Sequence, residues 1–413
     1  MKNVYKIRYE EEGNRIFSLY EHANKKIEQH KAAIIIHMHY EESINKYERY
    51  ITDVPREIDV FITSSSEEVL KKIKNQWQGF SNITIIKKEN RGRDISSFLV
   101  ACRSQLQKYD YFCFVHDKHA NRTRFKEDVE LWNRNLWENT IGSSHYIYNI
   151  LSYFEKDRSC GLLIPPEPIG EGISAWYHSA WYKDYECTRK LVEKIGLCTD
   201  IDEDFPPISI GTVFWAQGKA LKKLICRDWR YEDFPNEPMP QDGTISHAIE
   251  RILPYVCQDA GYKTYTCMSS DYSVTLMARS QYYFNCMSET AGKYLGLYSM
   301  NSILYMKKLE KKIGKYFEKY KSVYLYGAGL GGRQCLLFLL MNNCVPSGFI
   351  VSESINEKYI CGYPVYLYED IRDRLVNAGI IISVLEDTYK KEISDRLKTD
   401  KLNTFLLWKE IVE

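Results

Sequence analysis

Short runs of apolar, β-branched residues alternate with amphipathic segments over the first part of the chain. We predict strands at 32–40, 58–63 and 83–86, with helices at 42–50 and 66–76 between them. Continuous apolar runs of this length are typical of strands that are buried on both faces of a parallel sheet. Strand and helix alternate throughout, which predicts a doubly wound, mostly parallel α/β sheet.

The alternation continues and then loosens. A helix is predicted at 95–107, a strand at 111–115, packing helices rich in Trp and Leu over 124–154, and another strand at 208–216. The intervening stretch 165–172 is rich in Pro and Gly, which predicts a loop that would suit an acceptor wall in an enzyme.

A second α/β pattern begins near the end of the chain. Its predicted strands are 323–326, 347–351, 379–385 and 404–407. A chain of 413 residues exceeds the roughly 250–300 residues at which single cores stop growing, so more than one domain is expected. We divide the chain into an N-terminal extension (1–30), a larger α/β domain (31–275), a helical linker (276–321) and a smaller Rossmann-like α/β domain (322–413).

Composition narrows the functional classes. The formal net charge is +1, so no global field draws the protein to nucleic acid, and no nucleic-acid partner is expected. Twelve cysteines without a Cys-x-x-Cys pair predict reduced thiols rather than a zinc site or a disulfide framework. Neither a signal-peptide pattern nor an apolar window of ~20 residues is present, which predicts a cytoplasmic protein.

A polar turn follows the third predicted strand. It reads Asn90-Arg91-Gly92-Arg93-Asp94. The two arginines offer planar, permanently charged forks to phosphate oxygens, and the glycine lets the backbone approach a ligand closely. The aspartate could orient an arginine or bind a ribose or base edge. The alternative is a surface turn with a local Arg–Asp pair.

A second polar cluster, His116-Asp117-Lys118-His119, ends the strand at 111–115. Ligands of open α/β sheets bind at the carboxyl ends of the strands. Asp117 could hold Mg²⁺ or Mn²⁺ together with a diphosphate, because hard divalent ions favour oxygen ligands. Lys118 or a protonated His116 could instead neutralise a leaving diphosphate without a metal. The alternative is a solvated polar loop.

Four motifs in this order resemble the rhamnan synthesis protein F family and, more broadly, the nucleotide-sugar half of GT-A glycosyltransferases. They are Asn90–Asp94, His116-x-Lys118, Gly211–Ala216 and Asp242–Arg251, and the resemblance runs from about residue 32 to 265. It implies a GT-A-like sheet and transfer of L-rhamnose from dTDP-L-rhamnose to a surface polysaccharide. The implied partners are a nucleotide-sugar donor and a lipid-linked saccharide acceptor, reached by peripheral contact with the inner membrane face.

The resemblance also suggests a catalytic carboxylate. Asp242 opens a predicted helix and would be the general base that deprotonates the acceptor hydroxyl in an inverting displacement; the alternative is a helix N-cap. On the same helix, Glu250 is a weaker candidate base, and Arg251 could bind phosphate or pair structurally. Gly211 and Trp215 are candidates for the pocket wall, although a core position is the alternative for the tryptophan.

The smaller domain carries its own motif. Gly327, Gly329 and Gly332 fit G-x-G-x-x-G directly after a strand, with Glu353 about 20 residues further on. The region resembles the N-terminal nucleotide-binding domain of bacterial sugar acyltransferases, and a docking or structural role is the alternative. The basic, aromatic stretch 282–321 could lie on a membrane or form a solvated face.

Two other classes of function remain open at this point. One is an NAD-dependent oxidoreductase that works through the glycine-rich loop of the smaller domain. The other is a non-catalytic scaffold for polysaccharide assembly that uses both domains for docking.

Overall fold

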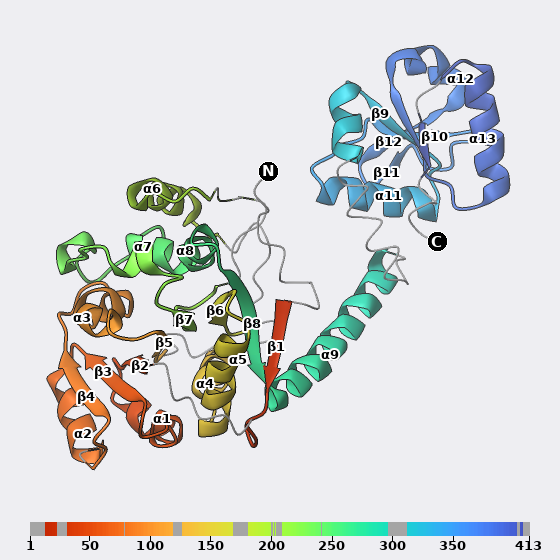
Figure 1. Ribbon diagram of the computed structural model, residues 1–413. Helices are drawn as coiled ribbons and strands as arrows, with labels where there is room; N and C mark the ends of the chain where they lie inside the picture. Colours follow the sequence, from red (N-terminus) through yellow and green to blue (C-terminus); the bar gives the residue numbers. More distant parts are fainter. Residues whose placement is uncertain are drawn as a thin grey trace. The chain divides into compact units, whose positions relative to one another are not determined.

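The computed structural model divides the chain into two compact units, Met1–Ser280 and Gln281–Glu413, and each is described by itself (Figure 1). The residues that the structure describes are 13–22, 31–77, 79–118, 126–167, 181–199, 201, 203, 209–240, 242–295, 312–402 and 405–407. The predicted boundary at 275/276 falls within one helix, α9 (Ser270–Leu295).

The first unit is built on one eight-stranded sheet, in the order β1-β8-β6-β7-β5-β2-β3-β4. β7 is antiparallel to both of its neighbours, and every other neighbouring pair is parallel. The predicted doubly wound, mostly parallel sheet is confirmed. The strands are β1 (Asn14–Phe17), β2 (Ala32–His37), β3 (Asp59–Ser64), β4 (Ile83–Lys87), β5 (Tyr111–His116), β6 (Cys160–Ile164), β7 (Phe214–Gln217) and β8 (Lys263–Ser269).

The sequence pattern missed part of this sheet. β1 lies in the predicted N-terminal extension, where its register pairs Asn14 with Thr266 of β8. β6 and β8 were not predicted, and the strand expected at 208–216 is confined to β7. β1 alternates between exposed and half-buried positions and is only four residues long, so it leaves a weak apolar signal.

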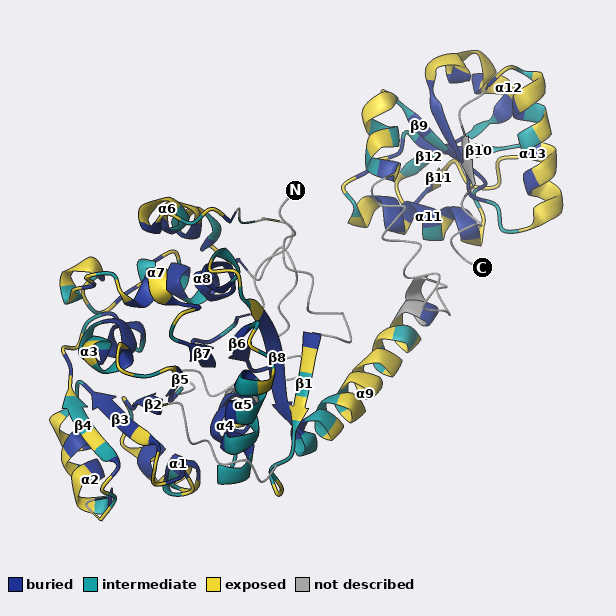
Figure 2. Cartoon of the chain, viewed as in Figure 1, coloured by how far each residue is buried: buried dark blue, intermediate teal, exposed yellow. Residues whose placement is uncertain are grey.

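Helices cover both faces of the sheet and bury two separate cores, visible as dark blue in Figure 2. Side chains alternate along each strand, so Ile34 and Ile36 of β2 enter one core, and Ala33 and Ile35 enter the other. One face carries α1 (Glu42–Thr52), α2 (Glu67–Trp77), α4 (Lys126–Ile141) and α5 (Ser144–Lys156). The other carries the π-helix η3 (Ser97–Ala101), α3 (Arg103–Leu106), α6 (Tyr185–Ile195), α7 (Lys222–Ile225), the short 3-10 helix η5 (Tyr231–Asp233) and α8 (Ile245–Asp259).

The helix expected at 95–107 is interrupted. A π-helix, η3, precedes α3, and the N–H of Cys102 donates to the carbonyl of Ser97 at 2.9 Å. Just before it, the Ser96 hydroxyl donates to the carbonyls of Arg91 and Arg93. π-turns often occur at functional sites, because the extra residue redirects the chain.

The second unit contains a six-stranded sheet, in the order β11-β12-β10-β9-β13-β14. In chain order its five parallel strands lie as 3-2-1-4-5, which is the Rossmann-type arrangement. The strands are β9 (Val323–Tyr326), β10 (Gly348–Val351), β11 (Tyr359–Ile360), β12 (Tyr363–Leu367), β13 (Gly379–Ile382) and β14 (Phe405–Leu407). The helices are α11 (Leu330–Met341), α12 (Tyr368–Ile371), η6 (Arg372–Asn377) and α13 (Asp387–Thr399).

The end of the predicted linker belongs to this second unit. Residues 312–319 are helical, and Ile313 and Tyr316 pack into its core. The Tyr316 hydroxyl also accepts from the N–H of Ile380 and donates to its carbonyl. The part of the predicted linker at 296–311 lies outside the described residues. In the described part of the chain, no helix has both the length and the apolar character needed to cross a membrane.

Candidate active site

The sheet topology fixes where a ligand would bind in the first unit. β3 and β4 follow on one side of β2, whereas β5 pairs with its other side, so the strand order reverses between β2 and β5. Open α/β sheets bind ligands in the crevice at such a switch point, outside the carboxyl ends of the strands.

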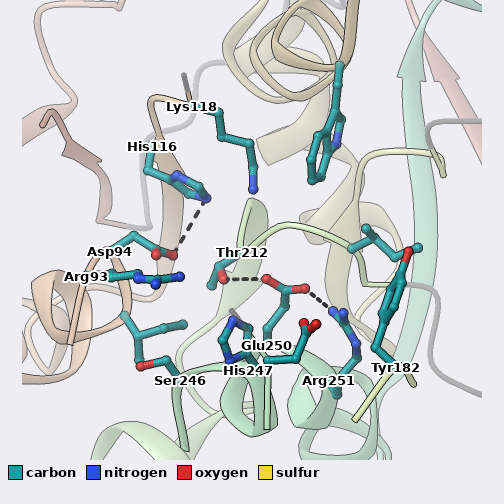
Figure 3. Close-up of a pocket in the computed structure, with 14 residues that line it drawn as sticks. Arg93, Asp94, His116, Lys118, Tyr182, Thr212, Ser246, His247, Glu250 and Arg251 are labelled. Atoms are coloured by element: carbon teal, nitrogen blue, oxygen red, sulfur yellow. Dashed lines mark hydrogen bonds and ion pairs between the residues drawn. The ribbon is translucent and has the colours of Figure 1, made fainter. Parts of the chain in front are cut away.

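A cavity of about 290 Å³ lies at this position, with one wall from the carboxyl end of β5 and the opposite wall from α8 (Figure 3). Seven of the thirteen site residues that were predicted in the first unit meet in it, although they are far apart in the sequence. It is lined by Arg93, Asp94, Ile95, His116, Lys118, Trp132, Tyr182, Ile210, Thr212, Asp242, Ser246, His247, Glu250 and Arg251.

Asp94, which is half-buried, and His116, which is buried, form a close pair on the β5 side. The Oδ2 atom of Asp94 lies 3.6 Å from Nε2 of His116. The other ring nitrogen, Nδ1, lies 2.9 Å from the carbonyl of Asp117, so it carries a proton and donates it. Burial lowers the pKa of His116 more than the Asp94 charge raises it. For Asp94, burial opposes ionisation, but His116, Lys118 and His37 outweigh it and lower the pKa of the carboxyl.

Lys118 supplies a cation to the same cavity. Its ammonium lies 4.1 Å from the ring centroid of Trp132, within cation–π range. Burial lowers the pKa of Lys118 to about 8. Gly211 lies behind this pair with φ +83°, and a Cβ there would lie 3.3 Å from Cε of Lys118. Gly211 is therefore the glycine that leaves room for the Lys118 side chain.

Arg93 reaches the cavity from a strained turn. Its φ is +43°, which is uncommon for a residue with a side chain, and it follows Gly92 with φ +72°. Its guanidinium donates to the carbonyls of Met239 and Pro240 at 3.2 and 3.4 Å. Tyr182 is another cavity residue with positive φ, at +49°. Strained backbone of this kind concentrates at functional sites.

Three members of the predicted donor-binding turn, Asn90, Arg91 and Gly92, lie outside the cavity lining. Nε of Arg91 donates to the carbonyl of Phe234 at 2.6 Å, so this arginine ties two loops together. The amide oxygen of Asn90 lies 3.5 Å from the hydroxyl of Ser65. Close packing requires a glycine at position 92, because a Cβ there would lie 2.7 Å from the Phe234 ring. Only Arg93 and Asp94 of this turn line the cavity.

The proposed metal ligand is already engaged. The Asp117 carboxylate accepts from the backbone N–H of His39 and of Tyr40 at 2.9–3.0 Å, so it fixes the loop after β2. Among the described residues, no group of three or more His, Cys, Asp or Glu side chains could hold a metal ion. Asp94, the carboxylate at this edge of the cavity, faces Lys118 and His116. These residues do not fit a metal.

Trp215 is a core residue and not a pocket wall. Its side chain is fully buried, and the indole N–H donates to the carbonyl of Thr140 at 2.8 Å. The prediction of Trp215 as a wall was therefore wrong, because its position in β7 turns the ring into the core. His119 and the loop residues 168–172 lie outside the described residues.

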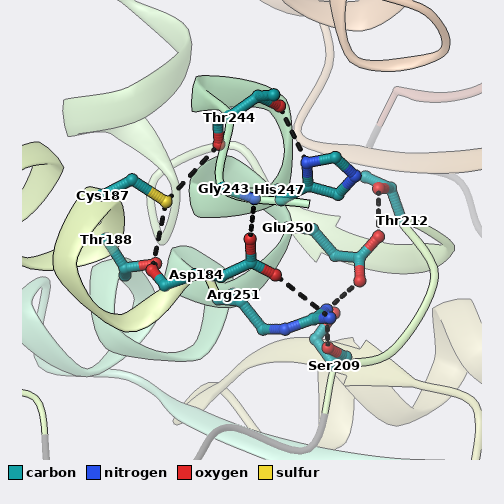
Figure 4. Close-up of polar contacts among 10 residues, drawn as sticks. All are labelled: Asp184, Cys187, Thr188, Ser209, Thr212, Gly243, Thr244, His247, Glu250 and Arg251. Atoms are coloured by element: carbon teal, nitrogen blue, oxygen red, sulfur yellow. Dashed lines mark hydrogen bonds and ion pairs between the residues drawn. The ribbon is translucent and has the colours of Figure 1, made fainter. Parts of the chain in front are cut away.

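The opposite wall of the cavity is held by a polar network around α8 (Figure 4). Thr244, rather than Asp242, is the N-cap of α8. Asp242 lies two residues earlier and lines the cavity. Glu250 accepts from the hydroxyl of Thr212 at 3.3 Å and pairs with Arg251. Two separate carboxylates therefore lie on this side of the cavity: Asp242, which precedes α8, and Glu250, which lies within the helix.

Asp184 links this helix to α6. Its Oδ1 accepts from the N–H of Gly243 at 2.7 Å, and its Oδ2 lies 3.6 Å from Arg251. Burial raises the pKa of the Asp184 carboxyl, although the Gly243 N–H and the Arg251 charge oppose the rise. Sequence reasoning missed Asp184, because this residue belongs to none of the motifs.

His247 is a further cavity residue that the predicted site omitted. Its Nδ1 lies 2.8 Å from the Thr244 hydroxyl. Burial lowers the pKa of His247, with Asp184 and Asp242 acting in the opposite direction. A helical spacing of three residues places it near Glu250, and this spacing was the signal that could have revealed it. Trp132, Tyr182, Ile210, Thr212 and Ser246 were also missed.

The fold and the cavity define a doubly wound α/β protein with a polar site at its switch point. Within that class, the chain belongs to the rhamnan synthesis protein F family, whose model matches residues 5–262. The resemblance predicted from the four motifs is confirmed, and it links the chain to polysaccharide synthesis. The match ends before the second unit, whose resemblance to sugar acyltransferases stays a prediction.

The chain is also similar to curated relatives of unassigned activity. These are "Uncharacterized protein WxcX" from two strains of Xanthomonas campestris pv. campestris, each 24% identical over 238 residues. The similarity covers 57% of this chain and 32% of each relative. The chain thus spans about a third of the length of these relatives.

Proposed function

We propose that the chain is a glycosyltransferase that moves a sugar from a nucleoside-diphosphate donor to a hydroxyl of a growing polysaccharide. One observation carries the proposal: Arg93 and Lys118 share a single switch-point cavity with Asp242. Fixed cations and a carboxylate on opposing walls are what displacement of a diphosphate by an alcohol requires. The family's name supports L-rhamnose, supplied as dTDP-L-rhamnose, as the sugar.

The proposed reaction is a single inverting displacement. The acceptor oxygen attacks the anomeric carbon, and the bond from that carbon to the diphosphate oxygen breaks. Asp242 takes the acceptor's proton, and the electron pair of the broken bond leaves with the diphosphate. Lys118 and Arg93 stabilise the developing negative charge, as preorganised donors do in a buried site.

Asp242 suits the role of base better than Glu250. The Glu250 oxygens already accept from Thr212 and Arg251, so this carboxylate holds the wall together. Asp242 lies on the loop that opens the helix, and the Gly243 N–H next to it is fixed by Asp184. A carboxylate on a fixed loop can be held close to the geometry that proton transfer needs.

Binding and transfer can be tested separately. In a thermal-shift screen with dTDP-L-rhamnose and other nucleotide sugars, with and without Mg²⁺ or Mn²⁺, a ligand at one hundred times its Kd should stabilise the fold by ~2.7 kcal/mol. Asp242→Asn should keep this response but lose transfer by about 10²- to 10⁴-fold. Asp228→Asn is the matched control, since this exposed aspartate pairs with Arg103 and Arg230 away from the cavity.

The results of these experiments distinguish a glycosyltransferase from a non-catalytic scaffold. A chain that bound no nucleotide sugar would contradict the glycosyltransferase proposal. A scaffold would support polysaccharide assembly equally well with Asn at position 242. Peripheral contact of 282–321 with the inner membrane face, where a lipid-linked acceptor would lie, is part of the proposal and is checked by sedimentation with anionic vesicles.

A further inference from the structure

Among the described residues, two buried side-chain atoms of the cavity lining have no hydrogen-bond partner: Nε1 of Trp132, which is a donor, and Nε2 of His116, which is an acceptor. His116 is 5% exposed, and its Nε2 has no hydrogen-bond partner among the described residues. The other nitrogen, Nδ1, donates to the carbonyl of Asp117, which fixes the tautomer and leaves a lone pair on Nε2. Buried polar atoms normally have partners, so an orphan at a ligand pocket indicates where a ligand atom belongs.

The group that faces this lone pair is also an acceptor. Oδ2 of Asp94 lies 3.6 Å from Nε2, and the neighbouring charges favour the ionised carboxylate (Figure 3). Burial lowers the pKa of His116 despite the opposing charge of Asp94, which favours the neutral imidazole. Two acceptors therefore lie against each other with no proton between them.

The protein's own nearby donor does not resolve this arrangement. In the described part of the chain, no hydrogen bond joins Lys118 to Asp94 or His116, and its ammonium lies over the Trp132 ring. A phosphate oxygen carries no proton to give and would be repelled by the carboxylate. A neutral O–H group adds no charge, and its single proton can be shared by the two acceptors in a three-centre hydrogen bond.

We propose that Asp94 and His116 form an acceptor pair that recognises a hydroxyl group of the nucleotide-sugar donor. The inference rests on the proposed function and adds which part of the donor these two residues recognise. The hydroxyl belongs either to the transferred sugar or to the ribose of the nucleoside. A site built to bind a hydroxyl discriminates strongly against the analogue that lacks it, because its buried groups are then left unpaired.

Substrate analogues identify the hydroxyl. The probes are dTDP-L-rhamnose, its 2-, 3- and 4-deoxy sugar analogues, and the analogue whose nucleoside carries 2′,3′-dideoxyribose and so lacks the 3′-hydroxyl, compared by kcat/KM for transfer. The intact chain should disfavour one of them by on the order of 10⁴-fold. A sugar analogue would assign the pair to the transferred group, and the ribose analogue would assign it to the nucleoside.

Variants connect that discrimination to the pair. His116→Phe keeps the ring but removes the acceptor, so it should accept the intact donor and the disfavoured analogue about equally. His116→Gln keeps an acceptor and should preserve part of the preference, which maintains the test if the Phe variant folds poorly. His145→Phe, a histidine outside this cavity, is the control and should behave like the unaltered chain.

Asp94→Asn separates recognition from a structural role. The amide can donate to Nε2 of His116, so the unliganded chain should melt at the same or a higher temperature while the hydroxyl preference falls. A structural pair would instead lose stability. If the unaltered chain transferred sugar but treated all analogues alike, this inference alone would fail; if it bound no nucleotide sugar, the proposed function would fail with it.

Discussion

The buried carboxylate of Asp184 accepts a hydrogen bond from the backbone N–H of Gly243, with Oδ1 and N 2.7 Å apart. This contact joins the N-terminal end of α6 to the loop that carries Asp242. Gly243 has φ +76°, a conformation that glycine adopts at little cost. The same carboxylate lies 3.6 Å from Arg251. One buried side chain thus fixes both the loop and the helix of the cavity wall.

Asp184→Ala should loosen this wall and leave the β5 side intact. Loss of the acceptor leaves the Gly243 N–H unsatisfied and removes one partner of Arg251, which should cost about 1–3 kcal/mol in the free energy of unfolding. We expect kcat to fall more than the affinity for the donor. Urea unfolding and steady-state kinetics measure the two effects.

Asp184→Asn is the matched control for that change. It keeps an oxygen for Gly243 but loses the charge beside Arg251, so it should retain more activity than the alanine variant. Equal losses of kcat in both variants would mean that the ion pair, not the contact with the loop, positions Asp242.

Donor binding should weaken above about pH 8. The pKa of Lys118 is lowered to about 8, so its ammonium is present below that pH and lost above it. If the ammonium binds the diphosphate, Kd should rise by up to about tenfold per pH unit above 8. Calorimetric titration with dTDP between pH 6.5 and 9.5 measures the slope.

The stability of the unliganded chain should respond in the opposite direction. Between pH 8 and 10.5 the unfolded chain still holds the Lys118 proton and the folded chain does not, so the contribution of this group to stability rises with pH. Lys118→Met should remove both dependences. A variant with an unchanged pH profile for donor binding would assign the profile to another group.

Arg93→Met should abolish the thermal response to donor, because it removes a cavity cation. Its own stability should change little, since the guanidinium is held by two carbonyls at 3.2 and 3.4 Å at the edge of the cavity. Arg91→Met is the comparison within the same turn. It lacks the bond to Phe234 and should lower the melting temperature while leaving most of the donor response. Identical behaviour of the two variants would remove Arg93 from the site.

The glycine-rich turn of the second unit can be divided into packing and ligand positions. A Cβ at Gly332 would lie 2.0 Å from the carbonyl oxygen of Gly327, so Gly332→Ala should unfold this unit at a lower temperature. A Cβ at Gly329 meets nothing within 4 Å. Gly329→Ala should therefore fold normally, as far-UV circular dichroism and thermal melts would show.

That tolerance makes Gly329 the test of the oxidoreductase alternative. If Gly329→Ala folds normally but loses activity and binding of NAD, the second unit is the active one. The glycosyltransferase proposal expects transfer to continue and no nicotinamide cofactor to be needed.

Much of the fold was determined by the sequence alone. The apolar runs at 32–37, 59–64 and 111–116 are buried on both faces, and a run of that kind fits only the middle of a parallel sheet. Parallel strands end at one edge of their sheet, so the motifs after β4 and β5 were expected at the same edge. The family resemblance followed from the same motifs and is confirmed.

Only the tertiary structure decided which side chains of those motifs face the cavity. Arg91 and Arg93 are two residues apart, yet a left-handed turn sends one to the carbonyl of Phe234 and the other to the cavity. Asp117 and Lys118 diverge likewise at the end of β5. The spacing of apolar residues along the sequence indicates which positions are buried. The direction of a side chain in a turn depends instead on the backbone dihedrals and on partners that are distant in the sequence. Asp184 is such a partner for the turn at Gly243.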